Sequence, residues 1–333
     1  MNTGIITFYN HSNYGAVLQA YALQTTLEDL GHEAFHVDFC DDIEPTISIT
    51  NNFIKQIETN KKIRDKHFSD FRNKFLKTKE INELINRDDI HYFVGSDQVW
   101  NPEITNGDER YFCTFADTLH KHTYGCSLGK IIGTKWEDIY SSNIKKFKDI
   151  SVREQSGVET IKKLTDRKAE VVLDPTLLLK SDQWETFVSQ KNNTSEKYLL
   201  YISVDNNIEQ YKHWKQFAQD NNLKFKTITA SFFPPAGFEP WSGVSVCDWI
   251  SYVYHADVVV TESFHGLVFS ILFHKNFIVE RLDNALKGRN NRLVELLNKL
   301  KLTSTDQANN ETDLIIDTLK NKSIEYIKNS LIM

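Results

Sequence analysis

The stretch Ala256–Phe273, ADVVVTESFHGLVFSILF, constrains the fold of this chain more than any other segment. Val258, Val259 and Val260 form a short β-branched run, which is typical of a strand buried on both faces of a parallel sheet. A polar turn follows, and Gly266 then opens an apolar run that predicts a buried helix. The stretch therefore indicates half of an α/β unit, in which ligands bind at the carboxyl ends of the strands.

The polar turn within this stretch, Thr261–His265, leads into the start of the expected helix. A helix N-terminus presents unpaired N–H groups and a partial positive charge, which suit a phosphate or a carboxylate. Ser263, His265 and the backbone of Gly266 lie where they can join those groups. The local alternative is that Ser263 is only an N-cap and His265 only a hydrogen-bonded turn histidine. Taken alone, the turn slightly favours an anion site.

The composition is that of a soluble globular protein. The chain has 333 residues, 40% hydrophobic and 25% charged, which is long enough for two domains. A formal net charge of -6 provides no global basic field, so we expect no nucleic-acid partner. No apolar run approaches the length of a membrane span, and the N-terminus has no basic n-region. We therefore expect a cytoplasmic protein whose membrane contact, if it has any, is peripheral.

The four cysteines are scattered along the chain and form no CxxC pair. This pattern indicates neither a disulfide framework nor a zinc site, and it fits a reducing compartment. We expect no bound metal.

The beginning of the chain has the outline of a nucleotide-binding unit. Ile5–Tyr9 predicts a strand, Ala16–Leu30 a helix with a broad apolar face, and Ala34–Phe39 the next strand. The GxGxxG fingerprint is absent from the turn, so a dinucleotide site is not supported. Asn13 and Gly15 in that turn either bring the backbone close to a ligand or merely shape the turn, and both readings are equally well founded.

A second polar segment, Gly95–Asn101, follows a strand predicted at Tyr92–Val94, and we read it as a turn. Its candidate ligand contacts are Ser96, Asp97 and Trp100. Asp97 suits a base or a contact to a sugar hydroxyl. Trp100 suits stacking on a sugar ring, although a tryptophan in such a place is more often part of the core.

A third candidate is Arg153, which follows a short strand predicted at Ile150–Val152. A guanidinium at the end of a strand can bind a phosphate or a carboxylate through two hydrogen bonds. The alternative is a surface charge pair with Glu154, and the strand-end position makes the two readings about even.

Strand and helix patterns alternate along the whole chain, which predicts two doubly wound α/β domains facing a cleft. We place the first domain at 1–179 and the second at 180–305. We expect a final helix within 306–333, which packs back on the first domain. The segment Arg281–Arg292 predicts a basic loop in the second domain.

Five turns, taken together and in order, resemble those of the polysaccharide pyruvyl transferase family. They are NYGAVLQAYAL (13–23), VGSDQVWN (94–101), SVREQSG (151–157), LDPTLLL (173–179) and TESFHG (261–266). The resemblance implies a GT-B-like fold of two Rossmann-like domains, the first on the acceptor side and the second on the donor side.

The resemblance also implies a reaction. Such enzymes transfer pyruvate from phosphoenolpyruvate to a hydroxyl pair of a sugar in bacterial cell-surface polysaccharide, and phosphate leaves. Arg153 and His265 match family positions linked to phosphoenolpyruvate. This chain has Ser263–Phe264 where the family pattern has Arg-Leu, so one guanidinium is missing, and Arg289 or Arg292 is a candidate to replace it.

In this reaction His265 is the candidate acid, because an imidazole titrates near neutral pH, and Asp97 and Glu262 are the candidate bases. The expected partners are phosphoenolpyruvate as co-substrate and a sugar or lipid-linked glycan as acceptor, with no resident cofactor. A lipid-linked acceptor implies that the enzyme acts at the inner face of the cell membrane. Two other hypotheses remain open: a glycosyltransferase that uses a nucleotide sugar, and a non-catalytic subunit of a polysaccharide-synthesis complex.

Overall fold

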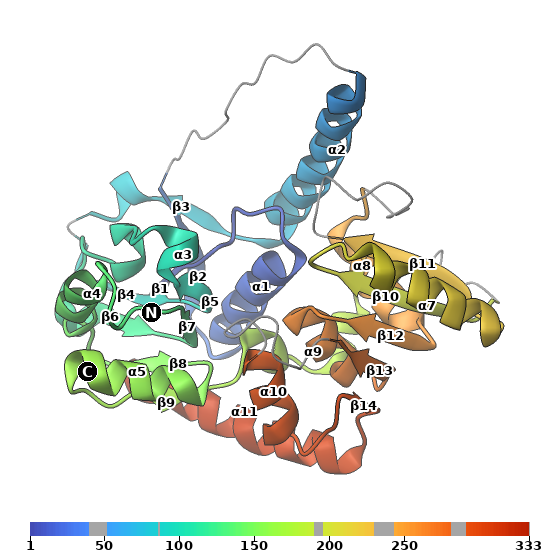
Figure 1. Cartoon of the computed structure of the whole chain (residues 1–333). Helices are drawn as coiled ribbons and strands as arrows, with labels where there is room; N and C mark the ends of the chain where they lie inside the picture. The colour runs from blue at the N-terminus through green and yellow to red at the C-terminus, as the bar shows by residue number, and fades with distance from the viewer. Residues whose placement is uncertain (40–51, 86, 190–195, 230–242, 281–290, 333) are drawn as a thin grey trace.

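Two parallel sheet systems, one in each half of the chain, stand on either side of the helices α1 (Tyr14–Asp29) and α9 (Phe264–Leu272) (Figure 1). The computed structural model describes residues 1–39, 52–85, 87–189, 196–229, 243–280 and 291–332. The alternation of strands and helices that the sequence predicts is confirmed, and the architecture is that of two Rossmann-like domains.

The sheet of the first half is built around β1. Its strands are β1 (Asn2–Ile6), β2 (Glu33–Asp38), β3 (Thr78–Glu80), β4 (Ile90–Val94), β5 (Asp97–Trp100), β6 (Lys121–Thr123), β7 (Cys126–Leu128), β8 (Ser151–Val152) and β9 (Glu170–Val171). One parallel ladder has the order β3-β2-β1-β4-β6, and the other has the order β5-β7-β8-β9. The second ladder continues the first, because β4 leads into β5 and β6 leads into β7.

The sheet of the second half contains the valine run with which the sequence analysis began. Its strands are β10 (Tyr198–Ser203), β11 (Lys224–Thr229), β12 (Val258–Thr261), β13 (Asn276–Val279) and β14 (Thr305–Asp306), in the order β11-β10-β12-β13-β14. All pairs are parallel except β13 with β14. Val259 and Val260 of β12 have no exposed surface, as expected for a central strand.

The helices cover the faces of these sheets and join the two halves. Besides α1 and α9 they are α2 (Asn52–Phe75), α3 (Pro102–Thr105), α4 (Glu137–Ile144), α5 (Gln155–Thr165), α6 (Ser181–Glu185), α7 (Ile208–Asp220), α8 (Val246–His255), α10 (Asn291–Lys299) and α11 (Asn310–Ser330). Short 3₁₀ turns are η1 (Ile81–Glu83), η2 (Glu109–Phe112), η3 (Thr118–His120) and η4 (Pro175–Leu177). In Figure 1, α2 projects away from the body and α11, in red, runs beneath both halves.

One hydrophobic cluster includes residues of both domains. Helix α1 is buried at eleven of its 16 residues, because η4 and α9 cover the sides that its own sheet leaves open. Its Tyr14 ring stacks on Trp249 of α8 at 5.5 Å between centroids. Trp184 of α6 packs edge-on against Phe269 of α9 at 4.9 Å. The domains are therefore joined by packed side chains as well as by the chain itself.

The prediction of a turn at Gly95–Asn101 is wrong, because Asp97–Trp100 forms the strand β5, which pairs with β7. The edge strands β3 and β14 were not predicted either, since strands of two or three polar residues have no period to detect. Most of the predicted basic loop, including Arg289, lies outside the described residues. No helix in the described ranges is both long and apolar enough to cross a membrane.

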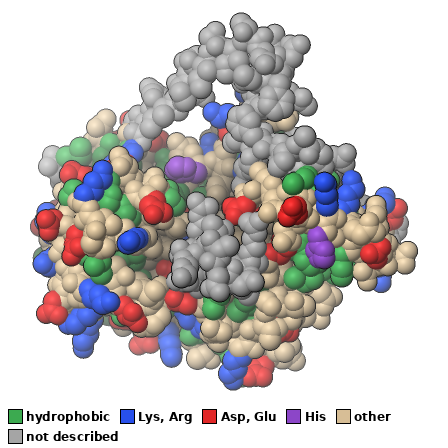
Figure 2. Space-filling model, viewed as in Figure 1, with side chains coloured by type: hydrophobic (Ala, Val, Ile, Leu, Met, Phe, Trp, Pro, Cys, Tyr) green, Lys and Arg blue, Asp and Glu red, His purple; other side chains and the backbone are tan. Residues whose placement is uncertain are grey.

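Acidic and basic side chains are interspersed on the face of the molecule shown in Figure 2. The coloured, described surface there carries no large patch of one sign, in keeping with the small net charge of -6.

Candidate active site

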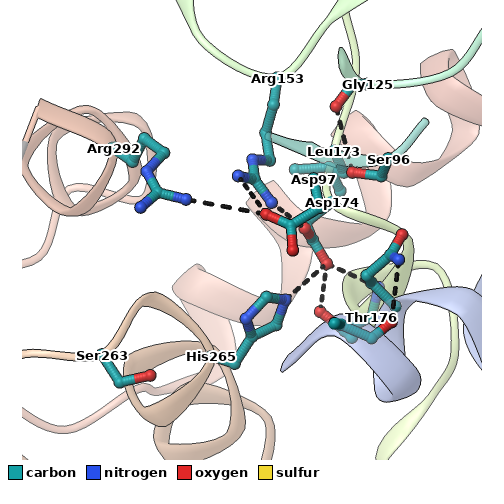
Figure 3. A network of polar contacts seen from close by, with 12 residues as sticks. Ser96, Asp97, Gly125, Arg153, Leu173, Asp174, Thr176, Ser263, His265 and Arg292 are labelled. Atoms are coloured by element: carbon teal, nitrogen blue, oxygen red, sulfur yellow. Dashed lines mark hydrogen bonds and ion pairs between the residues drawn. The ribbon is translucent and has the colours of Figure 1, made fainter. Parts of the chain in front are cut away.

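The centre of the candidate site is the carboxylate of Asp174, which contacts side chains from both domains (Figure 3). Nη1 of Arg153 donates to one Asp174 oxygen at 2.6 Å, and Nε2 of His265 lies 3.7 Å from the other. Arg153 follows β8, Asp174 is the N-cap of η4, and His265 lies in the first turn of α9. The structure thus brings together two predicted site residues that are far apart in the chain.

The Arg153 guanidinium is buried among three carboxylates. Besides Asp174 it contacts Glu154 (Nε to Oε1, 3.1 Å) and Asp97 (Nη2 to Oδ1, 3.4 Å), and its side chain is only 3% exposed. Burial acts to lower the pKa of Arg153, but the charges of Glu154, Asp174 and Asp97 outweigh it and raise the pKa above the usual range. The surface-pair alternative for Arg153 and Glu154 is therefore wrong, because both side chains are buried.

Asp174 is ionised despite being buried. Burial acts to raise its pKa, yet His265, Arg153 and the hydroxyl of Thr176 together hold the pKa well below its usual range. Thr176 donates two hydrogen bonds to Oδ1 of Asp174, one from its hydroxyl (2.6 Å) and one from its backbone N–H (3.0 Å). The carboxylate is consequently a fixed acceptor that orients Arg153 and faces His265.

A second guanidinium, that of Arg292, reaches the site from α10. Arg153 and Arg292 both face the ring of Phe264, with guanidinium carbons 4.7 and 5.8 Å from its centroid. Nη1 of Arg292 lies 4.0 Å from Asp97, and its side chain is 18% exposed. Burial, and then the like charge of Arg153, lower the pKa of Arg292. Asp97, Glu154 and Asp174 act in the opposite direction, and the contact of Arg292 with Asp97 is long.

The imidazole of His265 packs directly on the start of α1. A Cβ added to Gly15 would lie 2.0 Å from Nδ1 of His265, so only glycine fits there. Asn13 is the N-cap of α1 and accepts from the N–H of Ala16 at 3.2 Å. Both predicted residues of this turn therefore lie at the junction, Gly15 against His265 and Asn13 as a cap.

The junction encloses a cavity of about 20 Å³ between the domains. Its walls include Arg153, Glu154 and Asp174 from the first domain and Phe264 and Arg292 from the second. Such a volume holds about one water molecule.

Three predicted residues have structural partners instead of facing this cavity. Trp100 has no exposed surface and donates from Nε1 to the carbonyl of Tyr111 at 2.8 Å, so the stacking prediction is wrong. Ser96 is also fully buried, and its hydroxyl donates to the carbonyl of Gly125 at 3.1 Å. Glu262 accepts from the hydroxyl of Ser203 and from two backbone N–H groups of the turn after β10. Its carboxylate thus holds that turn together.

Ser263 and Gly266 shape the first turn of α9. The Ser263 hydroxyl accepts from the Gly266 N–H at 3.3 Å, which makes Ser263 an N-cap. A Cβ on Gly266 would lie 2.3 Å from the Thr261 hydroxyl, so glycine permits the helix to pack against the end of β12.

Sequence reasoning missed three residues of this site: Glu154 and Phe264 as direct neighbours of Arg153, and Asp174 as its centre. The signal for Asp174 was present, because Asp-Pro-Thr after a strand is a local N-cap pattern. Nothing in the local pattern showed that this carboxylate faces Arg153. Among the described residues, no group of three or more His, Cys, Asp or Glu side chains is arranged to hold a metal ion.

Comparison with known proteins gives a family and a fold. The family model "Polysaccharide pyruvyl transferase" matches residues 13–284. A search of curated proteins found no match. A solved structure of a putative UDP-N-acetylglucosamine 2-epimerase from Listeria monocytogenes is 12% identical with a TM-score of 0.50, over 98% of this chain and 90% of that chain.

Two further solved structures are similar to the same degree. MnaA of S. aureus, solved with UDP, is 10% identical with a TM-score of 0.50, over 99% of this chain and 91% of that chain. A UDP-N-acetylglucosamine 2-epimerase from Rickettsia bellii is 9% identical with a TM-score of 0.50, over 98% of this chain and 95% of that chain. At these identities the likeness concerns the fold alone, and it confirms the GT-B-like arrangement.

Proposed function

The chain belongs to the polysaccharide pyruvyl transferase family, and we propose from this that it transfers the pyruvyl group of phosphoenolpyruvate to a hydroxyl pair of a sugar. The observation that carries the proposal is the junction at Asp174, where Arg153 of one domain and His265 of the other share a carboxylate. A donor that bears both a phosphate and a carboxylate requires cations and a titratable group at one place.

Arg292 is the best-suited ligand for the donor anion in this proposal. Arg153 already has three carboxylate partners, whereas the ion pair of Arg292 with Asp97 is long, at 4.0 Å. Because burial and Arg153 lower the pKa of Arg292, a bound anion there stabilises its charged form. Arg292 also lies over Phe264, next to the position where the family pattern has an arginine. It is therefore our candidate for the missing guanidinium.

His265 is the proposed acid. Protonation of carbon 3 of phosphoenolpyruvate makes carbon 2 electrophilic, a sugar hydroxyl adds to carbon 2, and phosphate leaves as the second hydroxyl closes the ring. General acid catalysis of this kind raises a reaction rate by a factor of roughly 10²–10⁴. Nε2 of His265 lies 3.7 Å from the Asp174 carboxylate, which holds the imidazole at the junction.

Donor binding requires the junction to open. The cavity of about 20 Å³ is far smaller than a three-carbon phosphate, so Phe264 and Arg292 of the second domain must separate from Arg153 and Asp174 of the first. The described arrangement is then the closed member of a two-state equilibrium that the donor shifts.

The direct test is to supply phosphoenolpyruvate together with a panel of glycosides and to measure phosphate release and pyruvyl ketal formation by mass spectrometry. His265→Asn is expected to lower kcat by roughly 10²–10⁴ while the protein still folds. His274→Asn is the matched control, since His274 pairs with Asp313 on a partly exposed surface and is expected to retain wild-type turnover.

Binding of phosphoenolpyruvate is tested separately by a substitution at Arg292. Arg292→Gln is expected to weaken phosphoenolpyruvate binding roughly 10- to 100-fold by calorimetry, which corresponds to one charge-assisted hydrogen bond. Arg153→Ala is less informative, because it leaves the buried carboxylates of Glu154 and Asp174 without this cation and is expected to destabilise the fold. Unchanged donor affinity in Arg292→Gln removes Arg292 from the donor site.

The second candidate is a glycosyltransferase that uses a nucleotide sugar. It is supported by the similar fold of the S. aureus protein solved with UDP, and by Ser263–Phe264 in place of Arg-Leu. Release of a nucleotide from UDP-sugars, with no phosphate released from phosphoenolpyruvate, selects this candidate. Release of neither product selects the third, a non-catalytic subunit of a polysaccharide-synthesis complex.

The proposed reaction needs no resident cofactor, and phosphoenolpyruvate acts as co-substrate. The proposed acceptor is a sugar or a lipid-linked glycan of a cell-surface polysaccharide. A lipid-linked acceptor places the enzyme in the cytoplasm at the inner face of the membrane, through peripheral contact.

A further inference from the structure

A second and larger cavity, of about 480 Å³, lies in the first domain at the carboxyl ends of β1 and β2. Its walls are the segment Thr7–His11 after β1, the end of β2 with Phe39, and the segment from α3 to η2. This is the position at which open α/β sheets bind ligands, and the volume is within the range of small-molecule sites.

The walls of this cavity combine aromatic rings with a fixed charged pair. Arg110 contacts Asp108 through Nε at 2.9 and 2.8 Å and also through Nη2, and its guanidinium lies 5.6 Å from the ring centroid of Phe39. Tyr111 packs edge-on against Phe8 at 5.2 Å. Flat apolar rings next to oriented donors and acceptors suit a sugar, which has apolar C–H faces and a rim of hydroxyls.

His11 lines this cavity and is close enough to Asp97 for that charge to act on it, and the same holds for the hydroxyl of Tyr111. Asp97 in turn contacts Arg153 and Arg292. Along the chain, His11 precedes Gly15 by four residues, which spans at most about 14 Å, and Gly15 touches His265. Asp97 therefore lies near both this cavity and the donor junction.

The surroundings of His11 leave its ring available. The residue keeps exposed surface although its ring packs edge-on against Phe8 at 5.0 Å, and it has no hydrogen-bond partner within the described part of the chain. The groups that face it are Asp97, Arg72 and Arg110, and partial burial together with the two arginines lowers the pKa of His11 despite Asp97. The lowered pKa favours the neutral ring, which is able to accept a proton. Burial raises the pKa of Tyr111 to about 12, so its hydroxyl remains a donor.

We propose that the His11 cavity binds the acceptor sugar and that His11 is the general base that deprotonates the attacking hydroxyl. This assignment rests on the proposed pyruvyl transfer. The O–H bond of the sugar breaks, its proton passes to the imidazole, and the oxygen electron pair forms a bond to carbon 2 of phosphoenolpyruvate. The electrons of the carbon–carbon double bond take the proton supplied at carbon 3 by His265. Tyr111 donates a hydrogen bond to the acceptor and orients it.

The test compares His11→Ala with His213→Ala, an exposed histidine on α7 of the other domain, in the phosphate-release assay with a glycoside acceptor. For His11→Ala we expect kcat to fall roughly 10²–10⁴-fold, with phosphoenolpyruvate affinity within twofold of wild type by calorimetry. Added imidazole is expected to restore part of kcat, which a merely structural role does not predict. Tyr111→Phe is expected to raise the acceptor KM several-fold with a smaller change in kcat.

The outcomes separate this assignment from the proposed function. Turnover by His11→Ala within twofold of wild type, or a lowered kcat that imidazole does not restore, overturns the assignment while pyruvyl transfer stands. A wild-type protein that releases no phosphate from phosphoenolpyruvate with any glycoside overturns the proposed function, and the role of His11 as its base with it.

Discussion

Asp174 is a single buried carboxylate on which side chains from both domains converge. Its oxygens accept hydrogen bonds from Arg153 and Thr176, and His265 approaches one of them. Because Arg153 is also held by Asp97 and Glu154, its guanidinium has a fixed position within the first domain.

Gly15 is predicted to act through His265. Gly15→Ala places a methyl group 2.0 Å from Nδ1 of His265, so the imidazole must move away from its position beside Asp174. A displacement of about 1 Å can lower a rate roughly 100-fold, and we expect a kcat loss of that order with a smaller loss of stability. Turnover and thermal unfolding measured on the same samples check this.

The matched control for Gly15→Ala is the same change made in a His265→Asn background. If the methyl group acts only by moving the imidazole, it lowers kcat no further once the imidazole is gone. An additional large loss in the double variant contradicts the mechanism.

His36 is predicted to make the fold sensitive to acid. It has no exposed surface, neither ring nitrogen has a described hydrogen-bond partner, and burial lowers its pKa to about 3. Below pH 6.5 His36 binds a proton in the unfolded chain but not in the folded protein, so its titration does not lower the free energy of unfolding above pH 6.5. Below that, the free energy of unfolding falls by about 1.4 kcal/mol per pH unit as the pH falls toward 3.

His36→Phe keeps the ring and removes the titration, so the free energy of unfolding should fall less steeply between pH 6.5 and 4. Chemical denaturation at a series of pH values measures this slope. His213→Phe, an exposed site, is the control and is expected to keep the wild-type slope. An unchanged slope in His36→Phe shows that other groups dominate the acid sensitivity.

At the level of elements, α1 and α9 meet with their N-terminal turns at the site. The cap of α1 is Asn13 and the cap of α9 is Ser263, and each accepts a hydrogen bond from the first turn of its own helix. These caps place Gly15 and His265, each two residues after its cap, at the contact between the two helices. The same local rule that starts each helix thus places the His265 imidazole at the interface.

Ser263 is predicted to be a cap and not a substrate ligand. Ser263→Ala removes the acceptor for the Gly266 N–H and should lower the free energy of unfolding by about 1 kcal/mol, with kcat nearly unchanged. Ser245→Ala, at the cap of α8, is the matched change and should have a similar cost. A kcat loss of 100-fold or more in Ser263→Ala, restored by Ser263→Thr, indicates instead that the hydroxyl binds substrate.

For the whole molecule, α11 connects the two domains. Near its start, Asp313 pairs with His274 of the second domain at 2.9 Å. Near its end, the Tyr326 hydroxyl donates to the carbonyl of Thr123, and the Ser323 hydroxyl accepts from the N–H of Leu173, both at 2.9 Å and both in the first domain. The helix spans the junction on the side away from α2 (Figure 1).

Two apolar residues of α11 test this connection. Ile327 has no exposed surface and Leu314 is 67% exposed. Ile327→Ala should lower the free energy of unfolding by about 2–5 kcal/mol, and Leu314→Ala by less than about 0.5 kcal/mol. Urea denaturation followed by tryptophan fluorescence gives both values. Equal effects from the two changes contradict the packing role assigned to the end of α11.

The alternation of strands and helices was predictable because it depends on local periodicity. The valine run at β12, the helix after Asn13 and the final helix all follow from apolar spacing and cap residues within a few positions. The motif order likewise pointed to Arg153 and His265. The failures came where a local pattern was short or ambiguous, as at β5, where a strand of four residues looked like a polar turn.

The sequence by itself determined the two-domain α/β class and the family, because periodicity, caps and ordered motifs are properties of neighbouring residues. Only the tertiary structure decided that Asp174 joins Arg153 to His265, that Arg292 faces Phe264, and that Trp100 is inaccessible. These relations join residues tens to more than a hundred positions apart. Which distant charges and rings meet depends on how the two sheets pack against α1 and α9, and no local pattern encodes that packing.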